Sequence, residues 1–134
     1  MEQIIHFDDQ LKERVLEMEF ACENLCKTLQ EKFQPNFDLH GIKLILELIR
    51  SKKGKRLPPG ACFEDDYESV IEIGVEQEDD YYPNGYIPLW KCKEEWFQKT
   101  GYLTDKNLIE IGRMIEAMVI EILEDQESAQ LEGE

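Results

Sequence analysis

Several features of membrane and secreted proteins are missing from this sequence. No run of apolar residues approaches the ~18 that cross a bilayer. The first residues, from Met1 to Asp9, lack the basic region and the sustained apolar run of a secretory signal. Without such a signal, the four cysteines are expected to be reduced thiols. We therefore expect a cytoplasmic protein that has no membrane partner.

The sequence also has few residues suited to catalysis. Its two histidines are His6 and His40, and no nucleophile elbow, phosphate-binding loop or dinucleotide fingerprint occurs. Cys22 and Cys26 lie four residues apart, as two metal ligands on a helix can. However, Cys22 belongs to an apolar helical stripe, where a free cysteine behaves as a small hydrophobe. We therefore predict no metal site, no cofactor and no enzymatic activity.

One enzymatic alternative stays open because carboxylates are abundant. Glu121 and Glu124 form a Glu-x-x-Glu pair, as do the residues with which helical nucleotide pyrophosphatases hold magnesium. A matching second pair is missing from the other predicted helices. A magnesium-dependent nucleotide phosphohydrolase is therefore the less favoured function.

Basic residues are scarce, since 15 Lys and Arg stand against 30 Asp and Glu, for a formal net charge of -15. Such a field repels phosphate backbones and anionic lipid surfaces, and it attracts basic proteins. The exception is residues 52–62, where all charged residues are basic. Because this stretch contains Pro58-Pro59-Gly60, we expect a solvated loop. Charge therefore predicts a basic protein partner and argues against nucleic acid.

Apolar residues at spacings of three and four predict two long helices. The first covers about residues 9–33, with Asp8 or Asp9 as its cap and Pro35 as its end. Its apolar stripe is Leu11, Val15, Met18, Cys22, Leu25 and Leu29. Thr104 or Asp105 is expected to cap the last helix, which continues to about residue 124 and has an apolar surface wide enough for a central helix.

Two further helices are expected. Residues 39–51 contain Lys43, Glu47 and Arg50 at spacings of four and three, which define one polar ribbon on an otherwise apolar helix. Alternation of leucines makes a strand conceivable there, but length and the ribbon favour a helix. Residues 90–100 predict a short helix that ends at Gly101, with Trp90, Lys93, Trp96 and Phe97 near one face.

The middle of the chain contains the only predicted strands. Residues 67–76 alternate apolar and polar side chains around Ile71 and Ile73, which favours a strand over a helix. Residues 86–90 can pair with it through a loop over residues 78–85, and Pro88 would then require an edge position.

The predicted fold is therefore mainly α, a small bundle of three to four helices that can include a β-hairpin, with α+β as the alternative class. One globular domain is expected over residues 1–126. Residues 127–134 are polar and are expected to form a disordered tail.

The most suggestive segment for binding runs from Glu78 to Tyr86. Pro83-Asn84-Gly85 favours a surface turn, and tyrosines beside acids combine the anchors and the charge that interfaces use. Tyr81 and Tyr82 point to opposite sides of an extended chain. The predicted partner-binding residues are Glu78, Asp79, Asp80, Tyr81, Tyr82 and Tyr86, with Glu64, Asp65 and Asp66 adding electrostatic attraction.

This segment resembles the contact segment of colicin endonuclease immunity proteins, which are small acidic helical inhibitors of basic nucleases. The matching residues are Asp80, Tyr81, Tyr82, Pro83 and the later Trp96, and they span under a sixth of the chain. The resemblance and the charge imply the same function. We predict a stoichiometric inhibitor or immunity-type protein that neutralises a basic partner such as a nuclease toxin, or that mimics nucleic acid. The alternative is a structural or adaptor subunit.

Overall fold

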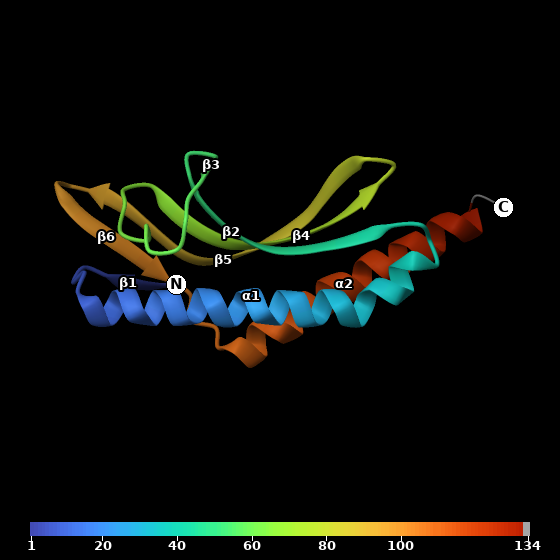
Figure 1. The fold of residues 1–134 in the computed structure, drawn as a ribbon, viewed down its shortest axis with the longest axis horizontal. Coiled ribbons are helices and arrows are strands. Elements are labelled where there is room, and N and C mark those ends of the chain that lie inside the picture. Colours follow the sequence, from blue (N-terminus) through green and yellow to red (C-terminus); the bar gives the residue numbers. More distant parts are fainter. Residues whose placement is uncertain (133–134) are drawn as a thin grey trace.

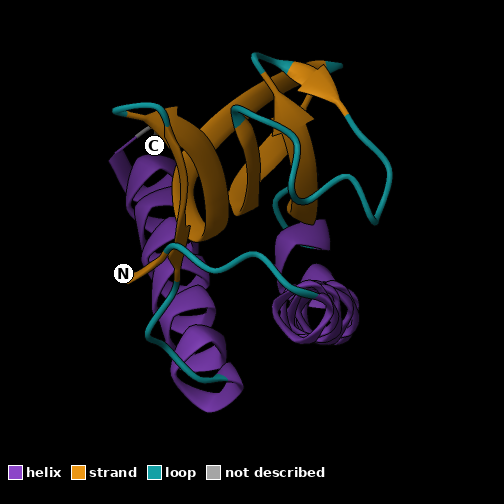
Figure 2. Ribbon diagram, turned by 90° about the vertical axis from the view of Figure 1, so that its left-hand side faces the viewer, coloured by secondary structure: helices purple, strands orange, loops and turns teal. Residues whose placement is uncertain are grey.

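In a computed structural model that describes residues 1–132, the chain forms a six-stranded antiparallel sheet with two helices on one of its faces (Figure 1 and Figure 2). This α+β architecture shows that the predicted bundle of three to four helices is wrong. The helices are α1 (Asp9–Asp38) and α2 (Leu108–Glu132). The strands are β1 (Glu2–Ile4), β2 (Lys43–Lys52), β3 (Lys55–Arg56), β4 (Tyr67–Gln77), β5 (Asp80–Glu95) and β6 (Gln98–Leu103), in the spatial order β1-β6-β5-β4-β2-β3.

The face of the sheet turned away from the helices, called the open face below, carries no helix. The strands bow toward the helices at their middle, and the hairpins at both ends curl away, so the open face is concave (Figure 1). Neither described helix contains an apolar stretch that could cross a membrane.

The first predicted helix is confirmed as α1. The Asp8 carboxylate accepts a hydrogen bond from the Leu11 N–H at 2.8 Å, as an N-cap does. The predicted end at Pro35 is wrong, because the helix continues past this proline to Asp38. Phe37 lies beyond the proline and is fully buried, so its packing offsets the hydrogen bond that the proline cannot make.

The last predicted helix is confirmed as α2, which buries one stripe against the sheet. The cap is Asn107 and not Thr104 or Asp105: its side chain accepts from the Glu110 N–H at 2.8 Å, and its own N–H donates back to the Glu110 carboxylate at 3.3 Å. Leu108, Ile109 and Ile120 are exposed, so α2 is not central. The helix reaches Glu132 and so includes part of the predicted tail, whose last two residues, 133 and 134, lie outside the described residues.

The predicted helix over residues 39–51 is wrong, because most of this segment is β2. Leu44, Leu46 and Leu48 face the helices and are buried, as strand alternation requires. The polar ribbon was misleading because Arg50 is itself buried. Lys43 and Glu47, in contrast, point to the open face.

The predicted strand at residues 67–76 is confirmed as β4, but the predicted loop over residues 78–85 is wrong. A two-residue turn, Glu78-Asp79, connects β4 to β5, and both residues have positive φ (54° and 67°). The Pro83-Asn84 pair is accommodated by a register shift in the β4–β5 ladder. Pro88 occupies an edge, as expected, because β6 pairs with β5 only from Trp90 onward.

The predicted helix over residues 90–100 is also wrong. It comprises the end of β5, a two-residue turn of Trp96 and Phe97, and the start of β6. Gly101 ends no helix; a Cβ there would lie 2.0 Å from the Trp90 ring, so only glycine lets this buried indole pack across β6. Trp96 and Phe97 are 95% and 100% exposed.

A buried polar network connects α1 to the sheet. Glu19 has no exposed surface and accepts hydrogen bonds from the Arg50 Nε at 3.0 Å and the Tyr67 hydroxyl at 2.7 Å. Arg50 also pairs with Glu23 of α1. Burial and the hydrogen bond to Glu19 raise the pKa of Tyr67, which keeps the hydroxyl protonated as a donor. The charge of Glu19 is thus compensated inside the molecule.

Candidate functional site

The open face gathers tyrosines and carboxylates from three adjacent strands. Cross-strand neighbours on β2, β4 and β5 form three rows: Lys43, Glu76 and Tyr81; Ile45, Gly74 and Pro83; and Glu47, Glu72 and Tyr86. Side chains of residues in register on adjacent strands lie close enough to interact. The rows therefore form one surface in which two tyrosines stand beside three carboxylates.

Tyr81 lies across the middle row. A Cβ on Gly74 would be 2.6 Å from the Tyr81 hydroxyl oxygen, so the ring fits only over a glycine. Burial first, and then the hydrogen bond with Glu72, raise the pKa of Tyr81. Tyr81 is nevertheless 40% exposed and Tyr86 is 57% exposed. Both rings thus offer apolar surface and a hydroxyl to a partner.

The carboxylates of this face are only partly neutralised. Glu47 and Glu72 are direct cross-strand neighbours, which is an unfavourable arrangement for two like charges. Arg56 relieves it by donating to the Glu47 carboxylate at 2.7 Å, and this hydrogen bond raises the pKa of Arg56. The open face therefore attracts further cations next to Glu72.

The structure brings together most of the predicted segment from Glu78 to Tyr86. Glu78 and Asp79 form the exposed tip of the β4–β5 hairpin, and Asp80 begins β5. Tyr81 and Tyr82 lie on opposite sides of β5, as expected. Tyr82 is on the helix side, where it lines a shallow hollow with Val75, Asn84 and residues of α2.

Glu64, Asp65 and Asp66 lie elsewhere. They precede β4, whereas Glu78 follows it, and a strand of 11 residues spans roughly 35 Å. Each acid pairs with a lysine: Glu64 with Lys52 at 3.9 Å, Asp66 with Lys53 at 3.5 Å, and Asp65 with Lys99 at 3.9 Å. The two acidic clusters therefore do not form one site, and this one partly neutralises the basic segment.

Sequence reasoning missed the carboxylates that complete the face. Glu47 was hidden because its segment was predicted to be a helix, and Glu72 and Glu76 were seen only as the polar side of a strand. The alternation of Ile45, Glu47 and Ile49 with three leucines was the available signal, because in a strand it places Glu47 opposite the buried side.

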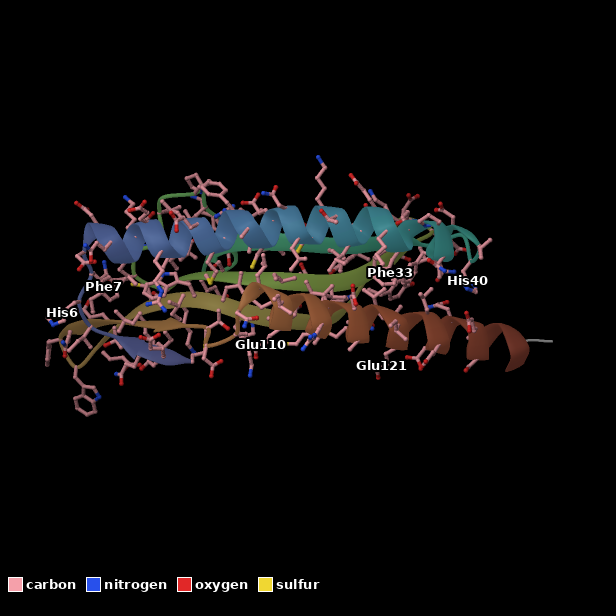
Figure 3. All side chains as sticks on the ribbon, turned by 90° about the horizontal axis from the view of Figure 1, so that it is seen from below. His6, Phe7, Phe33, His40, Glu110 and Glu121 are labelled. Carbon is pink, nitrogen blue, oxygen red and sulfur yellow. The ribbon has the colours of Figure 1, made fainter. Side chains whose placement is uncertain are left out.

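Other candidate residues do not converge. His6 precedes α1 and His40 follows it, so they lie at opposite ends of a 30-residue helix (Figure 3). Glu121 lies on α2 away from α1 (Figure 3), and Glu124 is also exposed. Within the described part of the chain, no group of three or more His, Cys, Asp or Glu side chains could hold a metal ion.

All four cysteines are buried free thiols, as expected for core residues. Burial is the main cause that raises the pKa of Cys22 to about 11, of Cys26 to about 12 and of Cys92 to about 11. A thiol reagent at pH 8 is therefore expected to label the folded protein at least ~100-fold more slowly than the urea-unfolded protein, since the thiolate is the reactive form. Rapid labelling of any cysteine in the folded protein would contradict its burial.

The same shifts set a pH dependence. The buried thiols have a higher pKa in the folded protein than the value near 9 of an unfolded thiol, so folding favours the neutral form. Their contribution to the free energy of unfolding is complete below about pH 9 and is lost as the pH rises through 11. The free energy of unfolding is expected to fall over this range, and less steeply in Cys22→Ala/Cys26→Ala. An equal slope in both proteins would show that other groups cause it.

The segment that resembles immunity proteins is not helical here. Asp80, Tyr81, Tyr82 and Pro83 lie on β5, and Trp96 lies in the next turn. The resemblance is therefore limited to residue types and does not extend to a helical fold. The chain matches no family model, and no curated protein or solved structure shows significant similarity to it.

Proposed function

We propose that this protein is an acidic binding module that holds a basic protein in a stoichiometric complex against the open face of its sheet. The observation that carries the proposal is the exposure of Tyr81 and Tyr86 beside Glu47, Glu72 and Glu76 on a concave face that no helix covers. Tyrosines are frequent anchors of interfaces, and arginines of a partner can both stack on them and pair with carboxylates.

Charge supports this class of partner. The net charge of -15 attracts a basic protein over long range and repels polyanions. The acidic hairpin tip, Glu78 to Asp80, stands at one end of the open face and adds to the attraction there. A nuclease is one basic protein that fits, because its phosphate-binding surface accepts carboxylates. The function is then that of an inhibitor or immunity-type protein, without a catalytic step.

The exposed turn of Trp96 and Phe97 supplies a second contact. It ends the hairpin at the opposite end of the sheet from Glu78, and both of these hairpins curl away from the helices (Figure 1). A large exposed apolar group on a soluble domain typically marks an interaction site. A partner seated in the concave face would therefore touch the tyrosines at one end and this turn at the other.

The test is affinity capture with the tagged chain from a lysate of its own source, at low and at roughly physiological salt. Tyr81→Ala/Tyr86→Ala is expected to lose about 100-fold in affinity, while the lysine variant Lys52→Ala/Lys53→Ala keeps the partner. The captured protein is expected to be basic, to bind one to one and to associate faster at low salt, because exposed charges are screened by salt.

Tyr86→Ala alone checks that lost binding does not reflect unfolding, since Tyr81 packs on Gly74 and Tyr86 is more exposed. Equal losses in the tyrosine and lysine variants would refute the location of the site. If the tagged protein captures only further copies of itself at both salt concentrations, the result would favour the structural or adaptor function.

A further inference from the structure

The outer edge of β2 is only partly covered. β3 pairs with Ser51 and Lys52, and the Leu57 N–H donates to the Arg50 carbonyl at 2.9 Å. Pro58 and Pro59 come next, and a proline cannot donate to a strand, so β3 ends there. Within residues 1–132, the stretch of β2 before Arg50 therefore pairs with β4 on one side and with no strand on the other.

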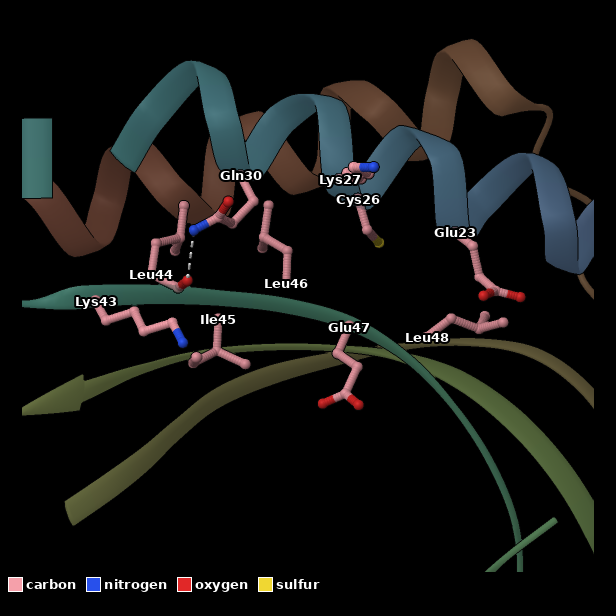
Figure 4. Close-up of a pocket in the computed structure, with 10 residues that line it drawn as sticks. All are labelled: Glu23, Cys26, Lys27, Gln30, Lys43, Leu44, Ile45, Leu46, Glu47 and Leu48. Atoms are coloured by element: carbon pink, nitrogen blue, oxygen red, sulfur yellow. Dashed lines mark hydrogen bonds between the residues drawn. The ribbon is translucent and has the colours of Figure 1, made fainter. Parts of the chain in front are cut away.

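The beginning of this edge is closed by two glutamines of α1. The Gln34 side chain accepts from the Leu44 N–H at 2.9 Å, and the Gln30 side chain donates to the Leu44 carbonyl at 3.4 Å (Figure 4). Backbone groups of an antiparallel strand alternate in direction, so those of Leu46 and Leu48 point the same way as those of Leu44. They face outward between the glutamines and the prolines.

A groove lies along this uncovered stretch. It has a volume of about 460 Å³ and is lined by β2 from Lys43 to Leu48 and by Glu23, Cys26, Lys27 and Gln30 of α1 (Figure 4). The only other long free edge among residues 1–132, the first half of β5, contains Pro83, Pro88 and two register shifts. Prolines and bulges protect an edge from pairing, and β2 has neither between Ile45 and Ile49.

We propose that the β2 edge accepts an extended segment of a partner protein as an additional antiparallel strand over residues 45–49. The segment would carry a Lys or Arg opposite Glu47, with apolar residues two positions away on each side. This second surface goes beyond the proposed function and does not depend on the tyrosines of the open face.

The register defines this chemistry. Leu46 and Leu48 would exchange hydrogen bonds with the added strand, which leaves Glu47 at a non-hydrogen-bonded position, where paired side chains are closest. Glu47 faces the open side next to Glu72. Arg56 already donates to Glu47 at 2.7 Å, so a basic residue of the added strand would share Glu47 with Arg56 and also approach Glu72. Ile45 and Ile49 occupy the non-hydrogen-bonded positions on either side of Glu47, and their side chains favour apolar neighbours on the added strand.

The remaining residues of the segment would turn toward α1. Cys26, Lys27 and Gln30 line that side of the groove, so small polar side chains fit there. An antiparallel strand is favoured because every pair in the sheet is antiparallel. A second copy of this chain is a poor occupant, since a two-fold axis at Glu47 would oppose this residue to itself between two molecules of charge -15 each.

The test uses a capped heptapeptide of alternating threonine and valine with lysine at its centre, titrated into the ¹⁵N-labelled full chain. Before addition, the amides of Ile45, Glu47 and Ile49 are expected to exchange at least ~100-fold more slowly than those of Leu46 and Leu48, because only the former are bonded to β4. With the peptide, saturable shifts are expected at Leu46 and Leu48.

The charge preference is tested by reversal. A peptide with central glutamate is expected to bind wild type at least 10-fold more weakly, and Glu47→Lys should prefer that peptide. Glu68→Lys is the matched control, because it changes the same charge on the same face but on an interior strand, and it should keep the wild-type preference.

Slow exchange at Leu46 and Leu48 in the free chain would overturn the proposal, as would a concentration-dependent dimer that protects these amides. The absence of binding, or a preference that Glu47→Lys does not reverse, would also overturn it. None of these outcomes bears on capture through Tyr81 and Tyr86, so the two proposals fail separately.

Discussion

Replacing Arg50 with methionine is expected to lower the free energy of unfolding by about 3–5 kcal/mol, because it strands a buried charge. Glu19 is completely buried and Arg50 is its only cationic partner within residues 1–132. Tyr67 would still donate to Glu19, but a neutral hydroxyl does not balance the charge. Urea unfolding at pH 7 measures the loss.

Two comparisons separate this effect from a general one. Arg56→Met breaks an exposed ion pair with Glu47, and it is expected to cost only about 0–1 kcal/mol. The triple variant Arg50→Met/Glu19→Leu/Tyr67→Phe removes the whole network and should recover most of the loss, since apolar replacements of buried ion pairs are often neutral. A small loss in Arg50→Met, equal to that of Arg56→Met, would contradict the burial of Glu19.

Changing the exposed turn to Trp96→Asn/Phe97→Gly is expected to make the protein more stable and a weaker binder. Both residues have positive φ (51° and 63°), and in this type of two-residue hairpin turn Asn-Gly is strongly preferred. The gain in the free energy of unfolding should be about 1–2 kcal/mol, because non-glycine residues are strained in this region. Partner affinity is expected to fall at least 10-fold, through loss of the apolar contact.

The β2–β3 turn offers a matched control. Lys53 and Gly54 form a two-residue turn of the same kind, with φ of 49° and 81°. Lys53→Asn should stabilise the protein slightly without a loss of partner affinity. If Trp96→Asn/Phe97→Gly binds as tightly as wild type, the turn is not part of the interface; if it is less stable, the side chains pack on something in the folded protein.

The two helices could be predicted from the sequence because each has an apolar stripe at helical spacing that is too long to be read as a strand. Their ends were less accurate, since caps depend on local hydrogen bonds. Asn107 forms a reciprocal cap with Glu110, a pattern that was readable in the sequence but was overlooked in favour of Thr104 and Asp105.

The strands were harder to predict from the sequence, because the buried charge of Arg50 made the pattern of β2 match that of a helix. A basic residue at position 50 counts as polar in any pattern, and only its pairing with Glu19, 31 positions earlier, explains its burial. Exposed apolar residues caused the opposite difficulty in β5 and β6. Trp96 and Phe97 looked like the apolar side of a helix, whereas both are fully exposed in a turn that favours other residues.

The tyrosine segment of the candidate site could be predicted from the sequence, but the carboxylates beside it were missed. Tyrosines beside acids marked Glu78 to Tyr86, and their exposure agrees with that interpretation. Glu47 was missed because its segment was predicted to be a helix, and Glu72 was seen only as the polar side of its strand. Glu64 to Asp66 seemed equivalent in composition, but the length of β4 separates them from the tyrosines.

The most direct test of the open face as the binding surface is hydroxyl-radical footprinting of the tyrosines in the free chain and in the captured complex. Tyr82 is an internal control, because it is 51% exposed but lies on the helix side of β5. Binding against the open face predicts protection of Tyr81 and Tyr86 while Tyr82 stays reactive. Protection of Tyr82 with unchanged labelling of Tyr81 and Tyr86 would place the partner on the other side of the sheet and contradict the proposal.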